Sequence, residues 1–291
     1  MNQIIVNIVV TTAILIIVSQ SFSLIYYAAK FFHLTHAVII TFGAYFFYLF
    51  SKQLDFNIWA ALSLAVICAT GIGMLAEISI YKPLRKRKTT PLIMVITSLG
   101  LYVIMQNVIS MIWGDDTKSI RTWDIKAGNE ILGAYITDVQ IVIIVSSLVL
   151  FIGIFLCLKY TKIGKNIRAI SSNEELSNIF GINSNRVILW SFGIGSALAA
   201  IAGILVAIDT DMTPTMGFNL LLYGVVAMII GGVGSTWGLV GGALLLATAQ
   251  HLSAYYIDSK WMDAVAYIIL ILFLIWKPLG FSGKRLKKIE I

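Results

Sequence analysis

Long stretches without charged residues constrain this chain more than any other feature. Asp, Glu, Lys and Arg are absent from 58–76, 91–113, 139–158, 187–208 and 212–257, and the last is long enough for two helices. A helix needs about 20 apolar residues to cross a bilayer, whereas barrel strands alternate apolar and polar residues over about 10 positions. Only 12% of residues are charged, against about 25% in soluble domains. The sequence predicts an all-α, polytopic integral membrane protein.

The uncharged runs also predict where the membrane spans lie. Segments of about 15 residues are short for a full crossing, so broken or re-entrant helices are expected and eight spans is as good a prediction as nine. No linker or strong repeat divides the chain, and we expect one transmembrane domain over 1–291 with long loops at 114–138 and 159–186. The nine predicted spans are 5–27, 36–50, 58–80, 91–113, 139–158, 187–208, 218–232, 236–256 and 262–279.

The basic residues are clustered along the chain. Three groups of five, within 82–88, 159–186 and 277–288, hold 15 of the 21 Lys and Arg residues. They follow the ends of predicted spans, as basic loops do on the cytoplasmic side of a membrane. This predicts an external N-terminus, a cytoplasmic C-terminus and a cytoplasmic loop 159–186. The net charge of +7 therefore reflects topology, and we expect membrane lipid rather than nucleic acid as a partner.

Residues 167–187, IRAISSNEELSNIFGINSNRV, form a polar island in this apolar chain. A Ser followed three residues later by a Glu is typical of a capping box, and acidic residues in the first turn favour the helix dipole. Apolar residues at i, i+3 and i+4 then form a stripe, and glycine is a common helix stop. The stripe would pack on the membrane surface, on the chain's own loops, or against a soluble cytoplasmic partner. The predicted short amphipathic helix comprises Ser172, Glu174, Glu175, Leu176, Ile179, Phe180 and Gly181.

Glycines interrupt the stretch IIGGVGSTWGLVGGA, where Gly231, Gly232 and Gly234 end a short apolar segment. At membrane depth, such an interruption needs protein or a water-filled cavity to satisfy the freed backbone groups. Because short, glycine-interrupted segments point to a transport pathway, we predict that these three residues lie beside the substrate path. Elsewhere, small residues spaced four apart predict close helix packing: Gly195, Ala199 and Gly203 in one span, and Gly234, Gly238 and Gly242 in another.

Several stretches match a known family in order and spacing. HLTHAVIITFGAY resembles the family's NFAHGEVYMIGAY, EISIYKPLR resembles its ERVAYRPLR, and GGVGSTWGLVGGALLLA resembles its GGIGSIPGAMIGGLILG. Residues 92–107, 164–205 and 277–284 match further family segments. The chain thus resembles the branched-chain amino acid ABC transporter permeases, and within them the H-type permease subunit of the leucine/isoleucine/valine system.

The resemblance implies partners that periodicity alone does not indicate. A family permease pairs with a second, related permease, two ATP-binding cassette ATPase subunits bind on the cytoplasmic side, and a periplasmic binding protein delivers the substrate. ATP and Mg would be held by the ATPase subunits, with no cofactor on this chain. The polar helix 172–181 would then be the coupling helix that enters an ATPase cleft. The location implied is the bacterial inner membrane.

The chain departs from the family near its N-terminus. The family's NFAHGE reads HLTHAV at 33–38, so His36 matches the family's histidine while His33 is new and a carboxylate is lost. If this segment touches the substrate, specificity differs, and His33, Thr35 and His36 are candidate pathway residues; the alternative is a structural role near a helix break. No third ligand is evident nearby, so we expect no metal site.

Two amides and one acid lie within predicted spans. Gln106 and Asn107 either hydrogen-bond to another helix, as polar side chains in membranes do, or contact the substrate. Glu77 precedes IYKPLR at the inner end of a span, and we expect it to pair with Lys82 or Arg85 or to act in gating.

The motifs of an enzyme are missing from the sequence. It has no Gly-x4-Gly-Lys-Ser/Thr phosphate loop, no Gly-x-Ser-x-Gly elbow and no His-Glu-x-x-His pair. We therefore expect a transporter subunit that imports branched-chain or other hydrophobic amino acids, and not an enzyme. The alternatives are a permease for urea or short amides, and a stand-alone channel or secondary carrier. A proton-coupled carrier is disfavoured because such carriers use acidic residues in mid-span.

Overall fold

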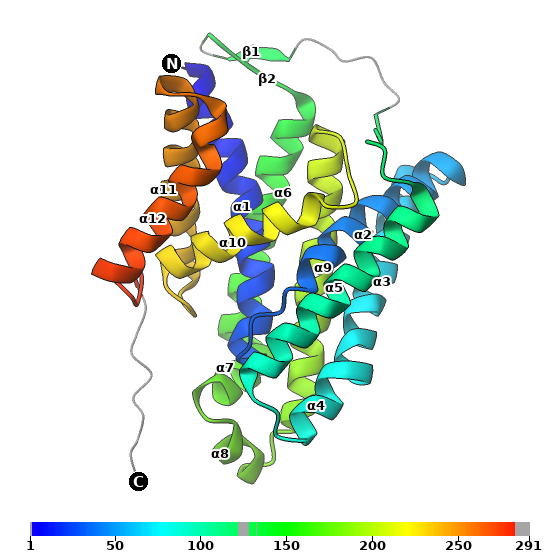
Figure 1. Ribbon diagram of the computed structural model, residues 1–291, viewed down its shortest axis with the longest axis vertical. Helices are drawn as coiled ribbons and strands as arrows, with labels where there is room; N and C mark the ends of the chain where they lie inside the picture. The colour runs from blue at the N-terminus through cyan, green and yellow to red at the C-terminus, as the bar shows by residue number, and fades with distance from the viewer. Residues whose placement is uncertain (1, 122–127, 132, 283–291) are drawn as a thin grey trace.

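The computed structural model describes residues 2–121, 128–131 and 133–282, and these are mostly helical (Figure 1). In chain order the elements are α1 (Asn2–Ala29), α2 (His36–Tyr48), the π-helical η1 (Leu49–Gln53), α3 (Ile58–Ala76), the π-helical η2 (Glu77–Tyr81), α4 (Lys82–Lys86), α5 (Pro91–Trp113), β1 (Asn129–Ile131), β2 (Ala134–Ile136), α6 (Asp138–Tyr160), α7 (Lys162–Ser172), α8 (Glu174–Ile179), α9 (Ser184–Asp209), α10 (Met216–Gly231), α11 (Thr236–Tyr256), the 3₁₀ turn η3 (Ser259–Trp261) and α12 (Met262–Trp276).

The prediction of an all-α, polytopic membrane protein is confirmed, but fewer helices cross the membrane fully than expected. Within the described residues, six helices are long and apolar enough to span a bilayer, and α10 and α11 form a pair bent by 119° that could count as a seventh. The prediction of eight or nine spans was therefore slightly too high. The predicted span 36–50 is the 13-residue helix α2, in which nearly every residue is buried by other helices. The predicted spans 218–232 and 236–256 are the two arms of the bent pair.

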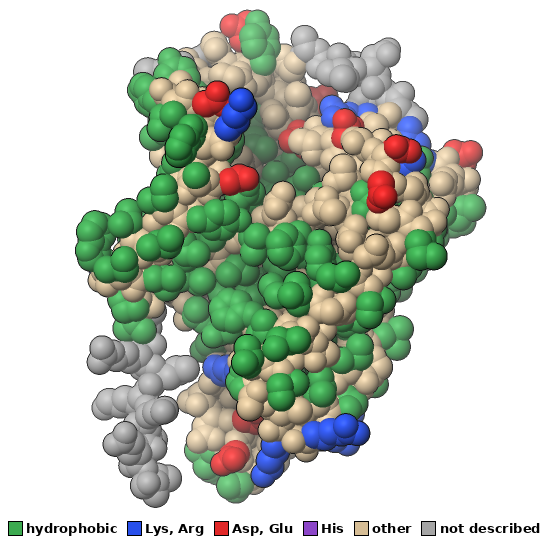
Figure 2. Space-filling view, viewed as in Figure 1, with side chains coloured by type: hydrophobic (Ala, Val, Ile, Leu, Met, Phe, Trp, Pro, Cys, Tyr) green, Lys and Arg blue, Asp and Glu red, His purple; other side chains and the backbone are tan. Residues whose placement is uncertain are grey.

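The helices are arranged around a central pair. In α1 and α9, 72% of the most apolar window is buried, whereas the corresponding fraction is 22% in α5, 17% in α6 and 6% in α12. Figure 1 shows α1 and α9 along the long axis, with α10 lying across it. Large apolar side chains on the outer helices are exposed, and they form the hydrophobic surface in Figure 2. Such a surface is stable in contact with lipid or with another subunit.

Small residues on α9 allow its neighbours to approach closely. A Cβ added to Gly203 would lie 1.9 Å from the carbonyl oxygen of Ile40 in α2, and one added to Gly195 would lie 2.8 Å from Ile25 in α1. Ala199 between them is fully buried. The predicted packing role of this stripe is confirmed, and it places α9 against both α1 and α2.

A second stripe holds the arms of the bent pair together. An added Cβ on Gly238 of α11 would lie 2.1 Å from the carbonyl oxygen of Gly231, and one on Gly242 would lie 2.1 Å from that of Ala227. The backbones of α10 and α11 therefore touch directly. The turn between the arms contains Gly232 and Gly234, with φ values of 97° and 85°, a left-handed region that glycine adopts at little cost.

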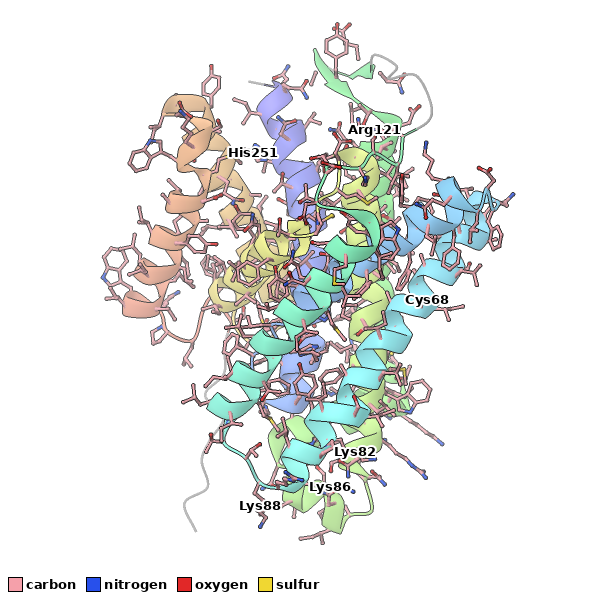
Figure 3. All side chains as sticks on the ribbon, turned by 45° about the vertical axis from the view of Figure 1, so that its right-hand side comes forward. Cys68, Lys82, Lys86, Lys88, Arg121 and His251 are labelled. Atoms are coloured by element: carbon pink, nitrogen blue, oxygen red, sulfur yellow. The ribbon has the colours of Figure 1, made fainter. Side chains whose placement is uncertain are left out.

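Charged side chains distinguish the two ends of the bundle, and Figure 3 labels Lys82, Lys86 and Lys88 at the lower end. The end that carries α4, α7 and α8, at the bottom of Figure 1, holds basic residues from 82–88 and 159–186, and most of the acidic residues in view in Figure 2 lie at the other end. Exposed aromatic residues mark both ends of the apolar surface, including Trp59 and Tyr256 at one end and Tyr160 and Trp276 at the other.

A buried ion pair lies directly after α3, at the basic end of the bundle. The Glu77 carboxylate, 1% exposed, accepts hydrogen bonds from the Arg85 guanidinium, as one of the two expected pairings had it. Arg85 also lies 3.5 Å from the side-chain oxygen of Asn185 in α9. The pair therefore links η2 and α4 to the central helix α9.

The loop 114–138 lies at the end opposite α8. Its described part contains the β1–β2 hairpin, which is tied to α1 because Gln3 and the backbone of Tyr135 exchange two hydrogen bonds, of 3.0 and 2.9 Å. The remainder of this loop, with Trp123, lies outside the described residues, as does the predicted basic cluster 277–288 beyond Ser282.

The close contact at Gly203 predicts the result of two matched substitutions. Gly203→Ala places a methyl group against the Ile40 carbonyl, and such overpacking costs about 1–3 kcal/mol. Gly153→Ala in α6 meets nothing within 4 Å, and alanine favours a helix over glycine by about 0.5–1 kcal/mol. We expect thermal unfolding in detergent to occur at a lower temperature for Gly203→Ala and at the same or a higher temperature for Gly153→Ala. The reverse order would contradict the packing of α9 on α2.

Candidate functional site

The polar island forms two helices at the basic end of the bundle (Figure 1). Thr161 caps α7, its side-chain oxygen accepting a 3.1 Å hydrogen bond from the Gly164 amide. The helix then continues to Ser172. Ile167 and Ile170 of α7 are buried beside Leu24 of α1 and Val187 of α9. The loop is therefore attached to both central helices.

The predicted capping box at Ser172 is wrong, because the capping residue is Asn173, one position later, and Ser172 belongs to the preceding helix. Ser172 is the last residue of α7, and Asn173 caps α8, its side-chain oxygen accepting a 2.9 Å hydrogen bond from the Leu176 amide. The reason is that α7 already uses the residues before 173, so the chain breaks at Asn173, whose backbone is extended. Glu174 and Glu175 still occupy the first turn as predicted.

The apolar stripe of α8 is left uncovered by the described part of the chain. Leu176, Ile179 and Phe180 are 50%, 79% and 77% exposed. Gly181 ends the helix with φ of 83°, as predicted. Packing on the chain's own loops, one of the expected alternatives, is therefore not seen within the described residues. The membrane surface or a partner remains to cover them.

The candidate pathway residues near the N-terminus are enclosed by the protein. His33, Thr35 and His36 have no exposed surface. The rings of His33 and His36 are 5.8 Å apart, and the His33 ring meets Tyr81 edge-on at 5.0 Å and Phe192 at 4.9 Å. In this conformation the three residues do not face an open cavity. Among the described residues no group of three His, Cys, Asp or Glu could hold a metal ion.

Hydrogen bonds from Thr35 and His36 join several helices. The Thr35 hydroxyl lies 2.6 Å from the Tyr81 hydroxyl and donates a 2.7 Å hydrogen bond to the Ser98 carbonyl. His36 Nε2 lies 2.9 Å from the Ser21 hydroxyl. Sequence reasoning missed Ser21, Tyr81 and Ser98; the polar run SQSFS inside the first apolar span is the one signal that could have indicated Ser21.

The predicted amides of α5 do not join this cluster. Gln106 donates to Ser110 at 3.3 Å, and Asn107 donates to the Val103 carbonyl at 2.7 Å, both within their own helix. Asn107 is exposed among apolar residues on the outer face of α5. Bonding to another helix, one of the two expected roles, is therefore not seen within the described residues, and contact with substrate stays a prediction.

The three predicted glycines lie at the α10–α11 turn, in two different surroundings. Gly231 and Gly232 are buried, and Gly231 is in backbone contact with Gly238. Gly234 is exposed and lines a cavity beside α1, where an added Cβ would lie 2.6 Å from the Tyr27 ring. Of this group, only Gly234 borders open space.

The comparison with known proteins identifies the family. A profile described as "Branched-chain amino acid transport system / permease component" matches residues 4–274. The chain belongs to this family. The permease is 31% identical over 226 residues to LivH of Salmonella typhimurium, a high-affinity branched-chain amino acid transport system permease protein, covering 76% of this chain and 72% of that protein.

Two further relatives extend the comparison. BraD of Pseudomonas aeruginosa, a permease protein of the same description, is 31% identical over 232 residues, which is 77% of the permease and 74% of BraD. A probable branched-chain amino acid transport permease of Methanocaldococcus jannaschii is 27% identical over 247 residues, 81% and 78% of the two chains. No solved structure is significantly similar to the permease. The family expected from the sequence motifs is confirmed.

The Thr35 hydrogen bonds predict a stability difference. Thr35→Val removes the hydroxyl that joins Tyr81 to Ser98, and loss of a buried partner costs about 1–3 kcal/mol. Thr97→Val is the matched control, because the Thr97 hydroxyl bonds only to Ile93 in its own helix. We expect a lower temperature of thermal unfolding for Thr35→Val and little change for Thr97→Val. Equal shifts would show that the Thr35 bonds do not stabilise the permease.

Proposed function

We propose that the permease translocates branched-chain or other hydrophobic amino acids across the bacterial inner membrane as a subunit of an ATP-binding cassette importer. Family membership and the printed descriptions of LivH and BraD support this proposal. The polytopic helical fold supports it as well. The chain is then a transport component whose partners hydrolyse ATP and hold Mg.

The observation that carries the proposal is the uncovered stripe of α8. A helix of six residues is marginal in water by itself, and exposed apolar residues next to charged ones mark interaction surfaces. Leu176, Ile179 and Phe180 have the i, i+3, i+4 spacing of helices that bind in apolar grooves. An ATPase subunit with such a cleft would cover all three.

Movement of α8 would pass directly to the centre of the bundle. α8 continues from α7 after the single residue Asn173, and α7 is anchored through Ile167 and Ile170 to α1 and α9. Because packed interiors are stiff, an ATPase stroke on α8 shifts both central helices. This supports a coupling role for α8, which lies within the predicted segment 172–181.

The distribution of charge supports a defined orientation. Basic residues of 82–88 and 159–186 gather at the α8 end, as on the cytoplasmic side of membranes. We place α8 and the C-terminus in the cytoplasm and the N-terminus outside. The β1–β2 hairpin then faces the periplasm, where a binding protein delivers substrate. A second, related permease would cover part of the exposed apolar surface of the outer helices.

The substrate class rests on the relatives alone. His33 and His36 are enclosed in this conformation, so they contact substrate only if the bundle opens between α2, η2 and α9. Urea and short amides are the alternative cargo, and a channel or carrier that needs no ATPase is the alternative mechanism.

Co-purification and transport test the proposal together. The complex is isolated from native membranes in mild detergent, its companions are identified, and the ligand of the binding protein is measured. We expect two ATPases, a second permease and a binding protein for branched-chain amino acids. A chain that purifies alone and transports in liposomes without ATP would contradict the proposal.

Substitutions in α8 test the coupling role separately. The double variant Ile179→Asp, Phe180→Asp should lose the ATPase subunits on purification and lose ATP-driven uptake at least about a hundredfold, because interface hot spots cost about 2–4 kcal/mol each. Ile257→Asp is the control, since Ile257 is 66% exposed near η3, at the other end of the bundle. Retention of the ATPases by the α8 variant would contradict the docking role.

A further inference from the structure

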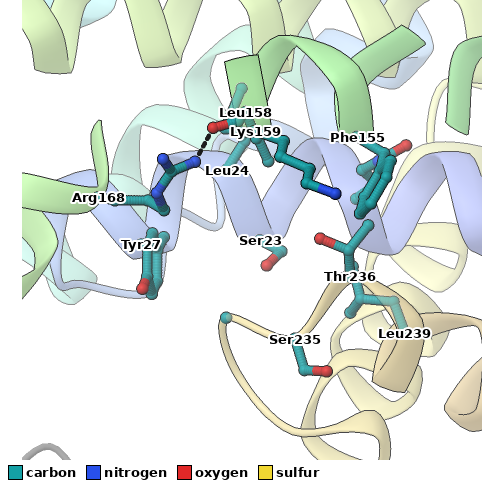
Figure 4. Close-up of a pocket in the computed structure, with 12 residues that line it drawn as sticks. Ser23, Leu24, Tyr27, Phe155, Leu158, Lys159, Arg168, Ser235, Thr236 and Leu239 are labelled. Carbon is teal, nitrogen blue, oxygen red and sulfur yellow. Dashed lines mark hydrogen bonds between the residues drawn. The ribbon is translucent and has the colours of Figure 1, made fainter. Parts of the chain in front are cut away.

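A cavity opens beside α1 toward the basic end of the bundle (Figure 4). It consists of two adjoining hollows of about 220 and 780 Å³ that share Tyr27, Phe155, Gly234, Ser235 and Thr236. Its walls come from the end of α1, the end of α6, α7 and the α10–α11 turn. We call this space the basic cavity. Arg168 of α7 lines it, and none of the exposed stripe residues of α8 does.

Three cations border the basic cavity. They are Lys30, Lys159 and Arg168, and none of them forms an ion pair within the described part of the chain. Lys30 donates to the Ser171 hydroxyl at 2.9 Å, Arg168 donates to the Leu158 carbonyl, and Lys159 lies 5.5 Å from the Phe155 ring centre. No acidic group among the described residues pairs with these three charges, and the site therefore favours an anion.

A buried amide also lines the cavity without a partner. Gln20 is 3% exposed, and neither its side-chain oxygen nor its nitrogen has a hydrogen-bond partner. An unpaired buried amide costs free energy, so a group that both donates and accepts would stabilise this wall. The Ser23 hydroxyl lies on the same wall. The basic cavity thus offers two uncharged polar side chains, Gln20 and Ser23, in addition to the three cations.

An apolar groove continues from the basic cavity along the membrane-facing side. Trp237 lines both, and the rings of Phe151 and Phe155 meet it edge-on at 5.6 and 5.9 Å. The groove has a volume of about 370 Å³ and is lined by α1 between Val9 and Ile16, by α6 between Ile144 and Ile152, and by α11 from Trp237 to Leu244.

The groove has a definite direction. It follows α1 from Ile16 to Val9 and α6 from Ile152 to Ile144, away from the basic cavity and toward the other end of the bundle. At 1.5 Å per residue, these segments span roughly 10–12 Å. An elongated apolar group whose polar end lies among the cations would therefore point into the membrane interior.

We propose that the basic cavity and the groove bind one anionic phospholipid of the cytoplasmic leaflet. Its phosphate lies among Lys30, Lys159 and Arg168, its headgroup or ester oxygens meet Gln20 and Ser23, and an acyl chain follows the groove past Trp237. Basic pockets between helices at the cytoplasmic side suit such headgroups. The groove favours a lipid over free phosphate, because a soluble anion would leave it uncovered. The bound lipid connects α1, α6, α7 and the α10–α11 turn.

Native mass spectrometry of the full-length protein tests the proposal. The protein is titrated with phosphatidylglycerol and, separately, with phosphatidylethanolamine. We expect tighter binding of phosphatidylglycerol and a loss of about thirtyfold in the variant Lys159→Gln, Arg168→Gln, which corresponds to about 1 kcal/mol for each cation. The control Lys52→Gln, Lys260→Gln removes the same charge away from the cavity and should bind as the unmodified protein does.

Four results would overturn the proposal. Equal affinity for the two lipids would remove the role of the cations, and so would unchanged binding by the Lys159→Gln, Arg168→Gln variant. If inorganic phosphate displaced the bound lipid as effectively as added phosphatidylglycerol does, the site would be one for a soluble anion. If the variant does not fold, the unmodified protein is instead photolabelled with phosphatidylglycerol that carries a photoreactive acyl chain. It should label α6 and α11 in the groove, and uniform labelling of α3 and α5 would equally overturn the assignment.

Discussion

Direct backbone contact at small residues is the interaction on which the rest of this structure depends. In a bilayer, lipid tails solvate apolar side chains as well as other helices do, so association relies on close van der Waals packing. Gly195 and Gly203 let α9 approach α1 and α2, and the α10–α11 contact uses the same device. The buried α2 and the polar cluster around Thr35 exist only because this central group is close-packed.

The long helices could be predicted from the sequence, and the short ones only in part. Spans such as 91–113 and 187–208 are uncharged over the full thickness of a membrane, so hydropathy alone locates α5 and α9. It does not separate a span from a buried helix like α2, since both are apolar on all sides. The 119° bend after Gly231 was indicated by its glycines, but its angle depends on contacts between the arms.

The candidate functional residues also divide into those that the sequence could predict and those that it could not. The apolar spacing of Leu176, Ile179 and Phe180 is a local property, and the structure leaves those side chains exposed. The helix start moved to Asn173 because α7 extends further than the capping pattern indicates, and that extension depends on Ile167 and Ile170 packing against distant segments. The partners of Thr35 and His36 come from α1, η2 and α5, and no spacing in the sequence brings these together.

The glycine contact between α10 and α11 has a consequence for how this chain can change. An added Cβ on Gly231 would lie 2.2 Å from the Gly238 carbonyl oxygen, and one on Gly238 would lie 2.1 Å from that of Gly231. The backbone of each glycine occupies the space that a side chain on the other would need. No substitution at the opposite position removes those backbone atoms. A larger residue at either site therefore has no compensating change at its partner. The two positions are therefore restricted jointly to glycine as long as the two arms stay in contact.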